Sequence, residues 1–323
     1  MNIFRMSGNI SRMLVIVAWA FTLLALLTVW LTVGRMNNIL SILLLDAFLF
    51  AGMGLFAGLF FSMHTLGNAH WINEIRFELK GMMVLLIAML PAFAFILFFL
   101  PDLYPWFNDT ELSVFQKAYF QSWTFVLRNV MYFTVWVILL GVFRRYDPFS
   151  CYNEGIRKYS AVFLVFTGIM ITPFSWDWLM SLDIHWHSTL YGWYVLSGIL
   201  SGGTAFLILV FWFCRKKDKV WKNPQPVRLY LARYLFAFSI VWMYLWYVQF
   251  FLVWYANLPG ETIYYIEKIR DFPVLFYLNP VLGFLIPFIL LISVKGKKNE
   301  LVLLISAFSC LLGQWIDRFL LIW

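Results

Sequence analysis

The sequence has little charge for its length. Only 12% of its 323 residues are Asp, Glu, Lys or Arg, whereas 63% are hydrophobic and the mean hydropathy is +0.81. Soluble domains carry about a quarter of their residues as charged side chains. The composition therefore excludes a soluble enzyme and a disordered chain, and it predicts an integral membrane protein.

Cysteine and histidine are also scarce. The three cysteines, Cys151, Cys214 and Cys310, are isolated from one another, so the sequence offers no ligands for an iron–sulfur cluster, a structural zinc site or a disulfide framework. None of the four histidines stands in the middle of an apolar run, which argues against haem held by two histidines. We expect no cofactor bound covalently or by metal ligands, and an outer loop with Asp183, His185 and His187 is only a weak metal signal.

What the sequence has instead is a series of long apolar runs. A helix that crosses a bilayer needs about 20 such residues. Nine runs qualify, and the prediction is an all-α polytopic membrane protein formed by a single membrane domain over residues 1–323. The nine predicted spans are about 13–33, 39–63, 81–100, 122–143, 159–181, 189–213, 229–256, 273–294 and 300–323.

The positive charges between these runs alternate from side to side. Seventeen Lys and Arg residues fall on the side of the N-terminus, and four fall on the other side. Cytoplasmic loops are enriched in Lys and Arg, so the pattern predicts a cytoplasmic N-terminus, and we do not expect the net charge of +8 to serve nucleic-acid binding. The seventeen are Arg5, Arg12, Arg76, Lys80, Arg144, Arg145, Arg157, Lys158, Arg215, Lys216, Lys217, Lys219, Lys222, Arg228, Lys295, Lys297 and Lys298, against Arg35, Lys117, Lys268 and Arg270.

Ionisable residues inside the spans are the first candidates for a functional site, because they are costly there unless they are paired or hydrated. Asp177 lies between two tryptophans near the outer end of the fifth span, with Pro173 one turn before it. Asp183 and His185 follow in the adjacent loop. These residues suit a proton route, but an interfacial aromatic belt, with Asp183 capping the next helix and His185 in water, would explain them equally.

Arg128 lies deep in the fourth span, and Asp317 lies in the ninth. An ion pair of Arg128 with Asp177 or with Asp317 is predicted, and such a pair serves as a proton relay only if water reaches it. Arg318 follows Asp317 about 100° further round the helix, so the two are expected to have different partners. Asp46, near the start of the second span, is expected at the membrane interface, as is the arginine near the start of the seventh.

The seventh span is rich in aromatic residues. Such a wall could hold a flat quinone ring, but helix packing and interfacial anchoring explain it more simply. No quinone-binding residue is assigned. The last run ends at Trp323 without a polar segment, so either Trp323 is an interfacial anchor or the chain continues in a longer protein, which we expect.

Three stretches resemble one known family. They are WDWLMSLDIHWHSTLYGWY over 176–194, WYANLPGE over 254–261 and QWIDR over 314–318. They resemble the F subunits of bacterial alternative complex III (ActF), within the NrfD/PsrC-like membrane subunits. The resemblance covers residues from about 120 to the end and rests on span order alone before that.

The resemblance implies a non-catalytic scaffold subunit, in the bacterial inner membrane, of a complex that oxidises quinol and passes electrons to cytochrome c or another acceptor. Haem and iron–sulfur clusters would lie on partner subunits. The other implied partners are a sister C subunit, a terminal oxidase and the surrounding lipids. The family fold implies ten spans in two four-helix bundles plus flanking helices, here residues 39–181 and 189–323. Arg128, Asp177, Asp183, His185 and Asp317 then match positions suited to a proton path coupled to quinol oxidation.

Two rival functions stay open on the sequence. A stand-alone secondary transporter would place a substrate at broken helices near the membrane midplane, and the prolines do not form a matched pair of interrupted spans. A purely structural membrane subunit would hold the same buried charges as inert ion pairs.

Overall fold

The computed structural model describes residues 3–32, 36–107, 112–145, 154–217 and 225–323, and these residues contain helices and no strands. Within them, nine helical segments are long and apolar enough to cross a membrane, which confirms the predicted all-α polytopic class. Helices follow from the composition, since a chain in hydrocarbon must satisfy its backbone hydrogen bonds internally. The long helices are α1 (Ile3–Thr32), α2 (Met36–Leu66), α4 (Val84–Phe98), α7 (Ser122–Arg145), α8 (Glu154–Trp178), α9 (Tyr191–Lys217), α10 (Gln225–Ala256) and α15 (Glu300–Ile322).

Shorter elements complete the spans or connect them. The third span joins α3 to α4, and the eighth joins α12 to α13 through a π-helical turn, η5. The shorter elements are η1 (His70–Glu74), α3 (Arg76–Met82), α5 (Leu100–Leu103), η2 (Pro105–Phe107), α6 (Val114–Tyr119), η4 (Met180–Leu182), α11 (Pro259–Asp271), α12 (Pro273–Pro280), η5 (Val281–Leu285), α13 (Ile286–Leu291) and α14 (Val294–Lys298).

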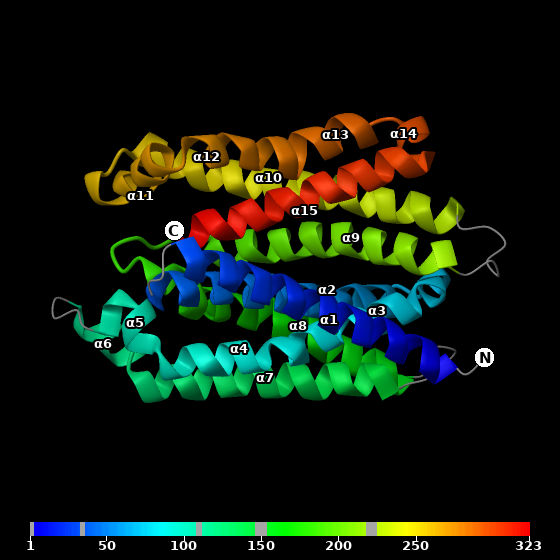
Figure 1. The fold of residues 1–323 in the computed structure, drawn as a ribbon, viewed down its shortest axis with the longest axis horizontal. Coiled ribbons are helices and arrows are strands. Elements are labelled where there is room, and N and C mark those ends of the chain that lie inside the picture. The colour runs from blue at the N-terminus through cyan, green and yellow to red at the C-terminus, as the bar shows by residue number, and fades with distance from the viewer. Residues whose placement is uncertain (1–2, 33–35, 108–111, 146–153, 218–224) are drawn as a thin grey trace.

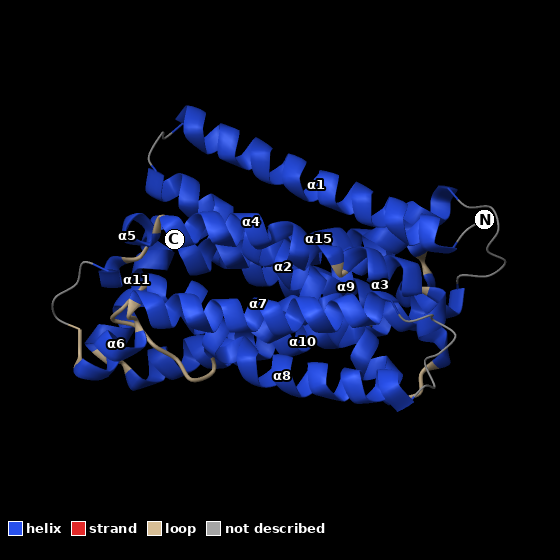
Figure 2. Ribbon diagram, turned by 90° about the horizontal axis from the view of Figure 1, so that it is seen from below, coloured by secondary structure: helices blue, strands red, loops and turns tan. Residues whose placement is uncertain are grey.

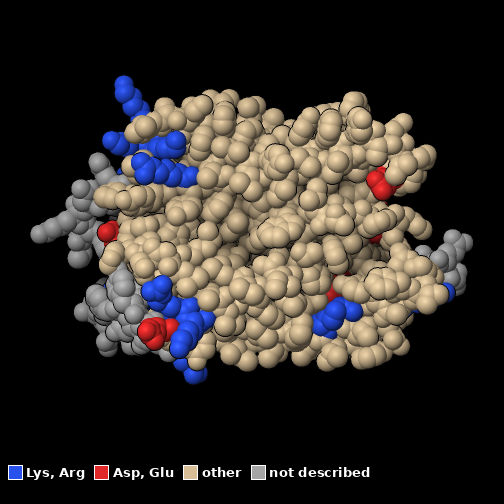
Figure 3. Space-filling model, turned by 180° about the vertical axis from the view of Figure 1, so that it is seen from behind, with Lys and Arg blue, Asp and Glu red and all other residues tan. Residues whose placement is uncertain are grey.

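The helices run side by side along the long axis of the molecule, with α1–α8 in one half of Figure 1 and α9–α15 in the other. One end carries the N-terminus, α3 and α14, and we call it the basic end. The other carries α5, α6, α11 and the C-terminus, and we call it the α11 end. Figure 3 shows Lys and Arg gathered mainly at the basic end of the face it presents, beside a broad surface belt without charged side chains. This distribution is the one expected of a protein that spans a membrane.

The core centres on α2, which packs on α1, α4, α8, α9 and α15. Almost every side chain of α2 from Leu40 onward is buried, because the helix is apolar on all its faces. Gly54 lets α4 approach closely: a Cβ at Gly54 would lie 2.6 Å from the backbone nitrogen of Leu86. By contrast, α1 lies along the outside of the other helices in Figure 2 and exposes much of its apolar surface.

A second close contact positions the C-terminal half. Gly313 of α15 packs on Gly283 of η5, where an added Cβ would lie 2.4 Å from the Gly283 nitrogen. The π-helical turn follows directly after Pro280, a residue that cannot donate a backbone hydrogen bond to the preceding turn. The contact sets the distance between α15 and Asn279, which lies just before η5 and donates to the buried acid Asp317.

The structure leaves one prediction untested, adds one helix and does not describe three of the charged residues. The division into bundles over 39–181 and 189–323 stays a prediction. Helix α11 was not predicted, because its 13 residues fall in the loop after the seventh span. Of the charged residues that carried the orientation argument, Arg35, Lys219 and Lys222 lie outside the described residues.

Candidate functional site

The first buried ion pair joins α7 to α8. Arg128 Nη2 lies 2.8 Å from Asp177 Oδ1 and its Nε lies 3.1 Å from Oδ2, so the guanidinium holds the carboxylate with two bonds. Arg128 Nη1 also donates to the backbone carbonyl of Tyr119, whose ring lies 4.0 Å from the guanidinium carbon. Asp177 is fully buried, whereas 21% of the Arg128 side chain is exposed. The alternative pairing of Arg128 with Asp317 is not formed.

Neighbouring bonds hold this pair in place. Trp178 Nε1 donates to Asn129 Oδ1 at 2.5 Å. Trp178 follows Asp177 and Asn129 follows Arg128, so this bond joins α8 to α7 directly beside the ion pair. The Tyr104 hydroxyl donates to the Trp178 carbonyl at 3.1 Å, and Tyr132 reaches Asp177 Oδ2 at 3.4 Å. A carboxylate with a bidentate guanidinium and a phenol donor is stabilised in its charged form.

The second buried acid, Asp317 on α15, has partners from three elements. Asp317 accepts hydrogen bonds from the hydroxyl of Tyr194 on α9, from Nδ2 of Asn279 on α12 at 3.0 Å, and from the adjacent Arg318. The expectation that Asp317 and Arg318 have different partners was wrong. A long arginine side chain can fold back along its own helix, and the Val195 carbonyl, 3.5 Å from Arg318 Nη2, directs it there.

A small cavity lies beside Asp317. Its volume is about 20 Å³, and its walls include Asp317, Asn279, Gln249 and Lys268. A polar cavity needs roughly 10–15 Å³ to hold one water molecule. The cavity therefore has the size and the lining for a single water against the buried acid.

A much larger polar cleft opens at the α11 end. It has a volume of about 370 Å³ and includes Asp183, His185 and Glu267 in its lining. Three side chains line both the cleft and the small cavity: Tyr264, Lys268 and Leu321. These three side chains form the partition between the cleft and the water-sized cavity at Asp317.

Lys268 is the functional candidate that the sequence analysis missed. Only 8% of the residue is exposed; its ammonium donates to the Leu320 carbonyl and lies 4.4 Å from the centre of the Tyr264 ring. Burial lowers the pKa of Lys268 to about 8, although the nearby Asp183 opposes this shift. The sequence pattern that could have indicated its burial is an amphipathic helix. Tyr264, Tyr265 and Lys268 recur at three- and four-residue spacing and face inward together.

Asp183 and His185 lie at the surface of this end. Asp183 Oδ1 accepts the backbone N–H of His185 at 3.1 Å, which closes a local turn, and α9 begins only at Tyr191. The alternative role of Asp183 as a cap of the next helix is therefore not what the structure shows. The segment from Met180 to Trp186 lies between the polar cleft and a second, apolar cleft.

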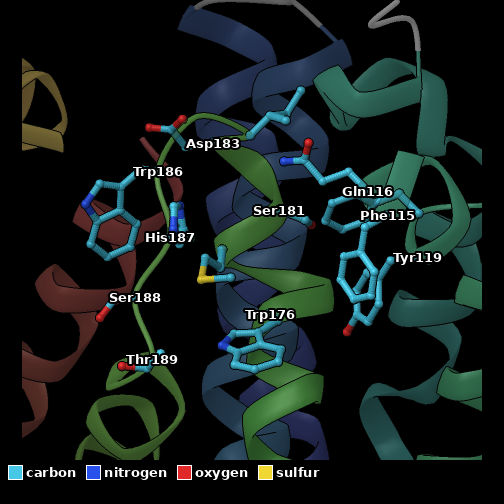
Figure 4. A pocket seen from close by; sticks show the side chains of 13 residues that line it. Phe115, Gln116, Tyr119, Trp176, Ser181, Asp183, Trp186, His187, Ser188 and Thr189 are labelled. Carbon is cyan, nitrogen blue, oxygen red and sulfur yellow. The ribbon is translucent and has the colours of Figure 1, made fainter. Parts of the chain in front are cut away.

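The apolar cleft has a volume of about 360 Å³, and its walls include several aromatic side chains (Figure 4). Phe115 and Tyr119 of α6 stand opposite Trp186 and His187, with Trp176 below them. The indole N–H groups of Trp176 and Trp186 are buried and form no hydrogen bond with the described residues. This cleft suits a ligand with a flat apolar body and acceptor oxygens.

Two other expectations about charged residues were wrong. Asp46 was expected at the membrane interface, but it lies inside α2 and is 1% exposed. The four-residue spacing of Glu74 and Glu78 likewise predicts a solvated helix face, but Glu78 is buried. Both errors have one cause: α2 and α3 are covered on several sides by other helices, which periodicity in a single span does not reveal. Arg233 is exposed, and its position at the membrane interface stays a prediction.

The aromatic span α10 presents much of its aromatic surface outward, with Tyr244, Tyr247, Trp254 and Tyr255 all exposed. His64 is a buried histidine with two partners, the Phe60 carbonyl at 2.7 Å and the Tyr234 hydroxyl at 2.9 Å. Within the described part of the chain, no group of three or more His, Cys, Asp or Glu side chains could hold a metal ion.

Comparison with known proteins gave no relatives: no family model matches the chain, and no curated protein matches its sequence. The fold and the site geometry therefore define a polytopic all-α membrane protein with buried, paired acids.

Proposed function

We propose that this chain is a membrane subunit of a quinol-oxidising respiratory complex, and that it provides part of a proton path through the bilayer. The sequence resemblance to the F subunits of alternative complex III supports the complex. The geometry at the α11 end supports the proton path. Turnover and electron transfer belong to partner subunits, which would carry the haem and iron–sulfur groups.

One observation carries the proton path. Asp317 adjoins a cavity of the size of one water, and Tyr264, Lys268 and Leu321 line both this cavity and the polar cleft with Asp183 and His185. Buried acids without access to water act only as structural ion pairs. Each of these three side chains lines both spaces, and one of them carries an amine. Proton exchange between cleft and cavity is therefore the function that fits best.

Lys268 supplies the titrating group in this path. Its pKa of about 8 lies near neutral pH, so its amine can both hold and release a proton there. Asp183 helps to keep that amine protonated, because its negative charge raises the pKa of Lys268. Asp317 receives donors from Tyr194, Asn279 and Arg318, so a proton that reaches it displaces one of these bonds.

The pair of Arg128 and Asp177 belongs to the proposal in a different way. Arg128 is part-exposed near the apolar cleft, and Asp177 is sealed behind it. The pair fixes the position of α6 through the Tyr119 carbonyl, and α6 forms one wall of the cleft. We therefore assign the Arg128–Asp177 pair a supporting role in the path: it places a positive and a negative charge beside the α6 wall of the cleft.

The proposed location is the bacterial inner membrane with the basic end in the cytoplasm. Eleven Lys and Arg residues at the basic end have described side chains, against Lys117, Lys268 and Arg270 at the α11 end. The eleven are Arg12, Arg76, Lys80, Arg144, Arg145, Arg157, Lys158, Arg228, Lys295, Lys297 and Lys298. The polar cleft would then open on the outer side, where quinol oxidation releases protons.

The test is the number of protons moved per electron by the purified complex in lipid vesicles. Asp317→Asn and Lys268→Met are expected to lower this number while the complex still assembles. Lys117→Met, which changes an exposed lysine at the same end, is the matched control and is expected to leave it unchanged. Intact assembly with an unchanged proton number in both site variants would reject the path and leave a structural subunit. Isolation of the chain alone, without haem and iron–sulfur partners, would favour the stand-alone transporter.

A further inference from the structure

Asp46 is a third buried acid, and it differs from the other two. Asp177 and Asp317 each have an arginine partner, whereas neither carboxyl oxygen of Asp46 forms a hydrogen bond or an ion pair in the described structure. Asp46 lies ten residues into α2, about 15 Å from its start at a rise of 1.5 Å per residue. That depth is well inside a hydrocarbon core about 30 Å thick.

The surroundings of Asp46 are neutral. Thr22 of α1 and Trp315 of α15 face the carboxyl group. The Thr22 hydroxyl and the Trp315 indole N–H are themselves buried without a hydrogen bond. Four polar atoms thus meet at the seam of α1, α2 and α15: the two carboxyl oxygens of Asp46, the Thr22 hydroxyl and the Trp315 indole N–H.

Among the described side chains of the packed helices, no charge compensates Asp46. On α15, Arg318 is directed to Asp317 and to the Val195 carbonyl, on the side of α9. On α8, Asp177 is held by Arg128 of α7. Helix α4 has no ionisable residue, and the described arginine of α1, Arg12, lies ten residues from Thr22 toward the basic end. His64 of α2 is eighteen residues away and bound to Phe60 and Tyr234.

From this geometry we infer that Asp46 is a proton-binding site that is occupied at neutral pH, so that the side chain is a neutral carboxylic acid. An isolated carboxylate in an apolar interior costs so much free energy that the group takes up a proton instead. The two facing groups suit the neutral acid, because the Thr22 oxygen can accept its O–H and the Trp315 N–H can donate to its C=O. Helix α1 covers this site, so its displacement would expose the acid.

The inference does not rest on the proposed function, and infrared spectroscopy of the protein in lipid tests it. The spectrum of the wild type minus that of Asp46→Asn, at neutral pH, is expected to contain the C=O stretching band of a protonated carboxyl group. Trp315→Phe removes the donor to that C=O and is expected to move the band to higher frequency. Asp177→Asn is the matched control, and it is expected to remove ionised-carboxylate absorption instead, since Asp177 is paired with Arg128.

A second measurement tests the inference on the wild type, in case the Asp46→Asn variant does not fold. A hydrophobic carbodiimide reacts with a protonated carboxyl group by addition: the acid O–H adds across the C=N bond, and the rearranged N-acylurea retains every atom of both reactants. Mass spectrometry of the wild type is expected to find this adduct on Asp46 and not on Asp177 or Asp317. Loss of only carboxylate bands in Asp46→Asn, or an adduct that sodium ions suppress, would overturn the inference in favour of an ionised, cation-bound Asp46.

Discussion

At the scale of single residues, the protein accommodates buried acidic side chains within its membrane-spanning helices in two ways. Asp177 and Asp317 each lie beside an arginine, which favours the charged carboxylate, and we infer that Asp46 is neutral. Buried ion pairs add little stability over apolar residues of the same shape, but the loss of one partner is costly because it leaves an uncompensated charge. The variants of greatest interest are therefore those that remove one member of a pair.

Arg128→Leu is predicted to lower the stability of the protein by roughly 3–5 kcal/mol, since it strands Asp177 without its bidentate partner. The double variant with Asp177→Asn is predicted to recover most of this loss. Thermal unfolding in lipid nanodiscs measures both. Asp271→Asn, which breaks the exposed pair of Arg270 with Asp271, is the matched control and should leave the unfolding temperature unchanged. Equal losses in the single and double variants would contradict a compensating pair.

Lys268 gives a pH dependence with a definite sign. Burial lowers its pKa from 10.5 to about 8, so the docked α11 releases this proton before the undocked helix does. Between pH 8 and about 10 the undocked state binds more protons, and stability is predicted to rise with pH, by at most about 1.4 kcal/mol per unit. Above that range Tyr264 opposes the trend, because burial raises its pKa.

Unfolding temperatures measured from pH 7 to 10 check this prediction. The wild type is expected to gain stability across the range, and Lys268→Met is expected to lose the gain. Lys117→Met should behave like the wild type, since Lys117 is exposed on α6. A wild-type profile that falls between pH 8 and 10 would mean that the amine is stabilised in its charged form.

At the scale of elements, the contact of α15 with η5 positions Asp317 one turn further along. Gly313→Ala would place a Cβ 2.4 Å from the Gly283 nitrogen, so backbone must move. We predict a loss of about 1–3 kcal/mol. The control Gly168→Ala adds a Cβ with no atom within 4 Å in α8 and should cost nothing. Thermal unfolding compares the two, and an unchanged Gly313→Ala protein would show that η5 adapts without cost.

The elements also show which features a sequence can predict. Each span was visible because burial in lipid demands about 20 apolar residues in a row, whatever the neighbours are. Asp177 and Arg128 were identified because a charge within such a run is conspicuous. Asp46 was misplaced and Lys268 was overlooked because their burial depends on other helices, α1 and α15 for Asp46 and the end of α15 for Lys268. A contact between two segments that are distant in the sequence produces no hydrophobic periodicity in either segment, so the sequence does not indicate it.

At the scale of the whole molecule, the charge difference between the two ends predicts one orientation. In a chain without its native cysteines, Lys117→Cys is expected to react with a membrane-impermeant maleimide on intact cells. Lys298→Cys, at the basic end, is expected to react only after the membrane is opened. The reverse pattern would place the polar cleft in the cytoplasm and remove the link to protons released outside.

The whole arrangement depends on water reaching Asp317 from the α11 end. A density map of the protein in a lipid bilayer, at a resolution that shows ordered water, measures this. We predict a water molecule in the cavity against Asp317 and Asn279, and a further chain of water in the cleft beyond Lys268. A dry cavity, closed by Tyr264 and Leu321 with no water on either side of Lys268, would contradict the proposed proton path.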